Sequence, residues 1–187
     1  MRRTPRTGDE VIALLLECHG VMLEARPEVG PGRFKDRANQ AGMTQFVAPG
    51  LVEATLRAGF ETGRSLVDHF ARALFMMFLV AEVHPFADGN GRMARVMMNA
   101  ELASAAQVRI IIPTVYRLNF LAALKGATHN DQFMPLVATL RFAQRYTARM
   151  DFTDRVTADR DLASTNALRD PQEAEDYGVR LVLPSAR

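Results

Sequence analysis

The chain has 187 residues, of which 48% are apolar and 24% charged, and its formal net charge is +2. This composition is typical of a globular domain with a sizeable core; it excludes a disordered chain and gives no basis for nucleic-acid binding. Cys18 is the single cysteine, so an intrachain disulfide is excluded and a reducing, cytoplasmic compartment is expected. The longest apolar run, 73–81, is about half as long as a membrane span, so no contact with a membrane is expected.

The chain is expected to begin with a basic tail over residues 1–8. Thr7 to Glu10 has the pattern of a capping box, which predicts the start of a helix. Apolar residues recur after it at helical spacing, and the helix should end before Pro27. His19 lies within this helix, and we interpret it as a structural histidine.

Residues 33–47 alternate weakly between apolar and polar about a turn near Ala41 and Gly42. This pattern is compatible with a short β-hairpin. From the periodicity alone, an irregular loop is nearly as well supported.

Helical patterns fill most of the remaining chain. One helix is expected from Pro49, and Ser65 is expected to cap the next, whose run 73–81 is apolar all round and predicts the centre of the core. Later helices are expected over 116–125, ended by Gly126, and over a stretch marked by apolar residues at helical spacing: Phe133, Val137, Leu140 and Ala143. The predicted fold is mainly α, a helical bundle with one small hairpin.

The most distinctive stretch is 84–95, which reads HPFADGNGRMAR. His84 can accept a proton near neutral pH, and Asp88 among positive charges makes most sense as a ligand of a cation such as Mg²⁺. Two glycines followed by a helix start provide a backbone anion site, and Arg92 and Arg95 suit phosphate oxygens. Taken singly, a histidine at a helix end, a Gly-Asn-Gly turn and a surface arginine pair are each better explained structurally. Their combination in this order favours phosphate chemistry.

Residues 84–95 match the signature of the Fic domain family, His-x-Phe-x-Asp/Glu-Gly-Asn-Gly-Arg-x-x-Arg, without a departure. Further segments resemble the family's flap region and a bacterial subgroup of it: 34–35, 39–42, 46–49, 110–113 and 165–185. The resemblance covers most of the chain from Glu10 onward. It implies a Fic domain over 9–150 with a hairpin flap at about 33–47, and a C-terminal helix and tail over 151–187 that pack on the domain.

The resemblance also implies an activity, the transfer of AMP from ATP to a Ser, Thr or Tyr hydroxyl of a target protein. His84 would be the general base and Asp88 the ligand of Mg²⁺. The residues implied in binding the nucleotide phosphates are Gly89, Asn90, Gly91, Arg92 and Arg95. The flap residues implied in docking the target, by main-chain pairing, are Phe34, Lys35, Gln40, Gly42 and Thr44.

Several alternatives stay open at this point. Glycine at position 89 favours AMP transfer over phosphorylation, but similar members of the family move UMP or phosphocholine. The chain is compatible with a Fic-type toxin controlled by a separate antitoxin, with a nucleotide-binding module without turnover and, less well, with a metal-dependent hydrolase. A homodimer is neither required nor excluded.

Many Fic proteins carry an inhibitory helix with the pattern Ser/Thr-x-x-x-Glu-Gly/Asn, whose glutamate pairs with the second arginine of the motif. Arg95 is the matching arginine here. None of the ten glutamates of the chain has Ser or Thr four residues before it. Either inhibition comes from another chain or from an N-terminal region outside this sequence, or the domain is free to act. We therefore expect the isolated chain to be uninhibited.

Overall fold

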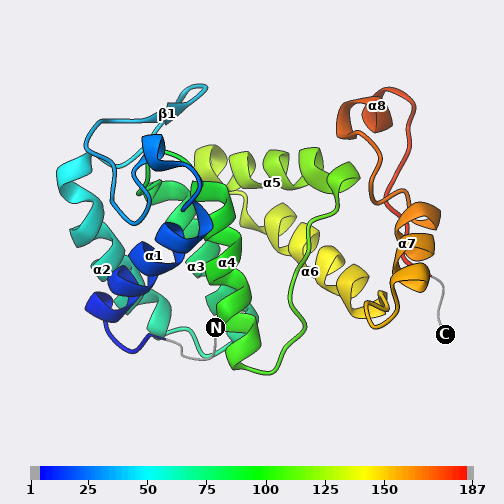
Figure 1. The fold of residues 1–187 in the computed structure, drawn as a ribbon, viewed down its shortest axis with the longest axis horizontal. Coiled ribbons are helices and arrows are strands. Elements are labelled where there is room, and N and C mark those ends of the chain that lie inside the picture. The colour runs from blue at the N-terminus through cyan, green and yellow to red at the C-terminus, as the bar shows by residue number, and fades with distance from the viewer. Residues whose placement is uncertain (1–4, 185–187) are drawn as a thin grey trace. The chain divides into compact units, whose positions relative to one another are not determined.

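The computed structural model describes residues 5–184, and it divides the chain into two compact units, Met1–Gln107 and Val108–Arg187 (Figure 1). The described residues form eight α-helices, three short 3₁₀ helices and one two-stranded antiparallel hairpin. The prediction of a mainly α fold with a small hairpin is thus confirmed. None of the helices in 5–184 is both long enough and apolar enough to cross a membrane. Part of the expected basic tail, residues 1–4, lies outside the described residues.

Four helices build the first unit: α1 (Gly8–Met22), α2 (Val52–Arg64), α3 (His69–Val83) and α4 (Asn90–Ser104). Helix α3 packs against both α2 and α4, and the apolar run 73–81 lies at the centre of this core, as its sequence predicts. Met76, Met77 and Val80 are almost fully buried. The buried helix α3 therefore provides a rigid support for the start of the motif loop.

The N-terminal cap of α1 is the one that the sequence predicts, and the N-terminal cap of α3 is not. Thr7 caps α1, because its Oγ1 accepts the Glu10 N–H at 3.2 Å. The expectation that Ser65 caps α3 is wrong: Asp68 does so, accepting the Ala71 N–H at 2.7 Å, and Ser65 ends α2. An aspartate is as good a cap as a serine, so the local pattern did not distinguish the two positions.

The hairpin consists of β1 (Gln40–Ala41) and β2 (Thr44–Gln45), joined by a turn at Gly42, where φ is +58°. Gln40 pairs with Gln45, and Ala41 pairs with Thr44. The hairpin is thus confirmed, although only these four residues of 33–47 form strands. Figure 1 shows it projecting from the first unit. The short 3₁₀ helices on either side are η1 (Pro27–Val29) and η2 (Pro49–Leu51).

The second unit contains η3 (Thr114–Tyr116), α5 (Arg117–Asn130), α6 (Phe133–Arg149), α7 (Arg155–Ser164) and α8 (Pro171–Asp176). Its C-terminal part packs on residues from η3 and α6 around a buried cluster: Val115, Tyr146, Met150, Ala167, Ala174 and Leu181. The expected end of a helix at Gly126 is wrong, because α5 continues through it to Asn130. A single glycine weakens a helix without having to end it.

Candidate active site

His84 lies at the C-terminal end of α3 in a left-handed backbone conformation, with φ +49° and ψ +57°. Its Nδ1 lies 3.1 Å from the carbonyl oxygen of Ala81. Because a carbonyl oxygen can only accept, Nδ1 carries the hydrogen in this contact and Nε2 keeps its lone pair. The ring is thereby oriented, and its basic nitrogen is defined.

The surroundings of His84 favour the neutral imidazole. Its ring stacks on that of Phe46, which follows the hairpin, with the centroids 3.7 Å apart and the planes 5° from parallel. Burial lowers the pKa of His84 below the ordinary value of 6.5; the charge of Lys35 acts in the same direction, and the Ala81 carbonyl acts against it. A neutral histidine with a lone pair can accept a proton.

Lys35 and Asn39 fasten the segment before the hairpin to the motif loop. The Lys35 N–H donates to the Pro85 carbonyl at 2.9 Å, and Lys35 Nζ donates to Asn39 Oδ1 at 2.6 Å. Asn39 Nδ2 donates in turn to the Phe86 carbonyl at 3.0 Å. Lys35 is buried, and this burial lowers its pKa. Both side chains thus position the loop.

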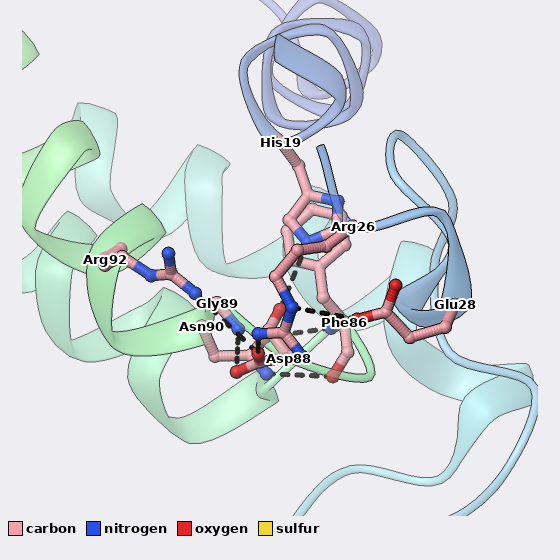
Figure 2. A network of polar contacts seen from close by, with 8 residues as sticks. All are labelled: His19, Arg26, Glu28, Phe86, Asp88, Gly89, Asn90 and Arg92. Atoms are coloured by element: carbon pink, nitrogen blue, oxygen red, sulfur yellow. Dashed lines mark hydrogen bonds and ion pairs between the residues drawn. The ribbon is translucent and has the colours of Figure 1, made fainter. Parts of the chain in front are cut away.

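Asn90 closes the loop on itself. Its Oδ1 accepts the Phe86 N–H at 2.8 Å, and its Nδ2 donates to the Phe86 carbonyl at 2.8 Å (Figure 2). The Phe86 side chain is fully buried. The side chain of Asn90 is therefore occupied in holding the loop, so only its backbone N–H is available to line an anion site.

His19 supports the loop from α1. Its Nδ1 accepts the Gly32 N–H at 3.1 Å, so its Nε2 carries the hydrogen and donates to the Asp88 carbonyl at 3.1 Å. Its ring stacks on Phe86 at 3.7 Å between centroids (Figure 2). Burial lowers the pKa of His19, and none of its surface is exposed. This agrees with its interpretation as a structural histidine, but its sequence position did not indicate that it holds this loop.

The carboxylate of Asp88 is surrounded by positive groups. Its Oδ1 accepts the Gly89 N–H at 2.6 Å, and its Oδ2 lies 2.5 Å from Arg26 Nη1 and 3.7 Å from Arg92 Nη2. The Gly89 N–H, followed by Arg26, lowers the pKa of Asp88. Arg26 also donates from Nε to Glu28 at 2.9 Å (Figure 2). Asp88 is thus ionised and half exposed.

The start of α4 has the properties of an anion site. Gly89 precedes it at φ +80° and offers no side-chain cap, so the first N–H groups of the helix point into the loop. The φ of +80° strains any residue other than glycine at position 89, and a Cβ there would lie 3.0 Å from Leu23 Cδ1, which would have to shift. A Cβ at Gly91 would lie 3.6 Å from Arg95 Nη1, so Arg95 crosses the first turn. Arg92, one turn from Asp88, is exposed.

The donor set around Asp88 fits magnesium only in part. No group of three or more His, Cys, Asp or Glu side chains arranged to hold a metal is found within 5–184. A metal ion at Asp88 would therefore take its other ligands from water and phosphate oxygens, which is how Mg²⁺ is commonly bound beside nucleotides. This arrangement suits a magnesium nucleotide better than the metal site of a hydrolase.

The five predicted docking residues of the flap fall into two groups. Phe34 and Lys35 face the motif loop: the Phe34 ring lies 5.4 Å from that of Phe86, and Lys35 is buried. Gln40 and Gly42 are exposed on the hairpin, and Thr44 is half buried. Phe34 and Lys35 would therefore act on a target only indirectly, by supporting the motif loop. The residues that sequence reasoning missed as parts of this site are His19, Arg26 and Glu28. Asn39 and Phe46 belong to the segments that resemble the flap region, but their contacts with the motif loop were not predicted.

The fold and the loop together define a helical domain that presents a neutral histidine beside a helix start suited to phosphates. Comparison with known proteins identifies the family, because residues 11–102 match the model of the Fic/DOC family. The chain belongs to the Fic/DOC family through these residues.

Two curated relatives are named as adenylyltransferases. Protein adenylyltransferase fic-1 of Caenorhabditis elegans is 28% identical over 169 residues, which are 86% of this chain and 32% of that protein. Protein adenylyltransferase Fic of Drosophila melanogaster is 31% identical over 129 residues, 66% of this chain and 26% of that protein. The chain thus spans about a third of the length of these relatives or less.

Solved structures agree on the fold. Fic-1 (residues 134–508) of C. elegans superposes with a TM-score of 0.60 at 27% identity, over 71% of this chain and 40% of that one. A Fic family protein from Desulfovibrio desulfuricans superposes with a TM-score of 0.57 at 21% identity, over 89% of this chain and 59% of that one. The prediction of a Fic fold is confirmed.

Proposed function

We propose that this chain transfers AMP from ATP to a Ser, Thr or Tyr hydroxyl of a target protein. The observation that carries the proposal is the pairing of two features on one loop: a histidine kept neutral by burial, with a defined lone pair on Nε2, and a glycine-led helix start beside an ionised aspartate. The first suits proton removal from a hydroxyl, and the second suits a magnesium-bound polyphosphate. The names of the relatives support the same reaction.

In this reaction His84 Nε2 removes the proton of the target hydroxyl as its oxygen attacks the α-phosphorus. The bond between the α-phosphorus and the bridging oxygen breaks, and pyrophosphate leaves. The N–H groups of Asn90 and Gly91 and the guanidinium groups of Arg92 and Arg95 bind the phosphate oxygens. The Gly89 N–H holds the carboxylate of Asp88, and the lack of a side chain at Gly89 lets the phosphates approach the backbone. Asp88 would hold Mg²⁺, which neutralises the charge on the leaving phosphates when bound.

The target would dock on the hairpin. Gln40 and Gly42 are exposed on a two-stranded hairpin, and an extended segment of the target would pair with the main chain of β1. The hairpin also follows directly on Lys35 and Asn39, which fasten it to the loop that carries His84. A segment paired with the hairpin would therefore be held at a fixed distance from the base.

Three observations bear on regulation and context. No glutamate of this sequence has the Ser/Thr-x-x-x-Glu pattern, so an inhibitor of Arg95 would come from another chain, as in a toxin paired with an antitoxin, or from a region of the protein outside this sequence. The resemblance of 110–113 and 165–185 to a bacterial subgroup and the single cysteine favour a bacterial cytoplasm. The neutral His84 argues against a pure binding module, because binding alone needs no base.

Labelled ATP tests the proposal. The isolated chain is incubated with candidate target proteins and ATP labelled at either the α or the γ position, and the products are examined by mass spectrometry. The α label should enter the protein together with an added AMP, and the γ label should not. Entry of the γ label alone would mean phosphorylation, and entry of neither label, with co-expressed chains removed, would contradict the proposal.

A further inference from the structure

Arg26 is a charged contact of the site that lies outside the motif. It follows α1 and precedes η1, and its N–H donates to the Leu23 carbonyl at 2.8 Å. Leu23 and Met22 lie against Gly89, so the segment that carries Arg26 is anchored beside the start of α4. Its guanidinium contacts Asp88 and Glu28 (Figure 2).

The ion pair between Arg26 and Asp88 is readily exchanged. Arg26 and Asp88 side chains are 48% and 43% exposed, and ion pairs at that exposure are weak because water screens them. A cation that uses Asp88 Oδ2 would displace Arg26 Nη1 from it. Glu28, which accepts from Nε, would keep the guanidinium close to the loop with its Nη donors available.

Two roles for Arg26 are compatible with this exchange. As a counter-ion of Asp88 alone, it would compete with the metal, and its removal would leave nucleotide binding unchanged or tighter. As a phosphate ligand, it would bind the nucleotide once Asp88 takes the metal, and its removal would weaken binding. An exposed ion pair contributes little free energy. Pairing with Asp88 alone therefore does not explain why Arg26 is also held in place by Glu28.

The charge balance favours the second role. The charges of a nucleoside triphosphate and of the Asp88 carboxylate together exceed those of one magnesium ion and the two arginines of the motif. A further guanidinium group at the phosphates reduces this excess of negative charge, and Arg26 is the arginine that already lies at Asp88. Glu28, which is 62% exposed, offsets part of the charge of Arg26. Guanidinium groups bind phosphate oxygens by paired hydrogen bonds.

We propose that Arg26 is a ligand of the polyphosphate of the donor nucleotide, released from Asp88 when the metal binds there and kept in place by Glu28. This inference rests on the proposed function, since it presumes a magnesium nucleotide at the loop. It assigns to a residue outside the motif a share in selecting donors that carry several phosphates.

Calorimetry with a non-transferable ATP analogue, bearing a methylene bridge between the α- and β-phosphorus, tests this role without turnover. In the presence of magnesium, Arg26→Gln should weaken binding by about tenfold or more, because a hydrogen bond to a charged group is lost. Adenosine, which has no phosphate, should bind the variant and the unaltered chain equally. Arg26→Lys should recover part of the affinity, because it restores the charge without the fork.

Arg57→Gln is the matched control. Arg57 is 44% exposed and pairs with Asp9 at 2.7 Å and with Glu53 at 3.5 Å, so it resembles Arg26 in charge, exposure and pairing. Its replacement should leave the affinity for the analogue unchanged. The melting temperature of each variant shows that it is folded.

The outcomes separate the inference from the proposed function. If the unaltered chain binds the analogue and Arg26→Gln binds it as tightly or more tightly, Arg26 is only a counter-ion, and the inference is overturned while the proposed function stands. An equal loss in Arg57→Gln would likewise overturn it, because the effect would be one of net charge. If the unaltered chain binds no magnesium nucleotide, the inference and the proposed function both fail.

Discussion

The two ends of the motif loop are held in different ways. At His84, an aromatic stack and a hydrogen bond to the main chain orient the ring, and burial lowers its pKa. At Asp88, a half-exposed carboxylate is held by ion pairs to Arg26 and Arg92. The first arrangement is preorganised, whereas the second can exchange partners. Under the proposed function, an oriented neutral ring suits proton removal, and exchangeable ion pairs suit a site that takes up a phosphate and its cation.

The largest expected effect is at His84. His84→Asn should lower the rate of AMP transfer by a factor of about 10² to 10⁴, because general base catalysis is lost. Asparagine is preferred to alanine because it tolerates the left-handed backbone conformation, so the melting temperature should change little. Transfer of the α label at an undiminished rate by the folded variant would remove His84 from the chemistry.

The hairpin is expected to affect target modification alone. Deletion of 40–43 removes β1 and the turn but keeps Lys35 and Asn39, which hold the loop. Nucleotide binding should be spared and modification of the target lost. Met43→Ser changes the most exposed side chain of the turn without removing main-chain pairing, so it should modify the target normally. A deletion variant that does the same would reduce the hairpin to a structural loop.

At the exchangeable end, Asp88→Asn should weaken magnesium-dependent nucleotide binding by about tenfold or more. The variant keeps an oxygen that can accept from Gly89 and removes only the charge. Titration of the nucleotide with and without magnesium measures the effect. Equal affinities for the variant and the unaltered chain would mean that the metal and the phosphates bind elsewhere.

A smaller effect is expected on stability, at Asn90. Asn90→Ala would leave the buried N–H of Phe86 without its acceptor and take one donor from the Phe86 carbonyl. The free energy of unfolding should fall by about 2 kcal/mol. Denaturation with urea measures this loss. A variant as stable as the unaltered chain would show that the loop does not depend on the side chain of Asn90. The claim that fixed hydrogen bonds preorganise the His84 side of the loop would then lose support.

Local patterns in the sequence predicted the parts of this site that are local in the chain. His84, Asp88 and the start of α4 at Asn90 follow from a stretch of twelve residues and need no tertiary contact to be recognised. The core position of 73–81 follows from its lack of polar residues. The placement of Phe34 and Lys35 against the loop did not follow, because a weakly alternating segment does not indicate which side chains turn inward.

The missed contacts share a different property. His19 and Arg26 reach Asp88 across 69 and 62 positions of the chain, and Asn39 reaches Phe86 across 47. Each is an ordinary polar residue in its own segment, and its role arises only when α1 and the segment before the hairpin pack on the loop. No periodicity or spacing in a single sequence encodes such a contact.

The central claim is that a neutral His84 takes the proton in AMP transfer, and the dependence of kcat/KM on pH tests it most directly. The unaltered chain should transfer the α label at a constant rate from neutral pH down to below the ordinary histidine pKa of 6.5, because burial lowers the pKa of His84 and the neutral form persists. The rate should then fall as His84 becomes protonated. Phe46→Ala removes the stacked ring, so its profile should fall at a higher pH. A rate that already falls above 6.5 in the unaltered chain, or a profile that Phe46→Ala leaves in place, would contradict the account.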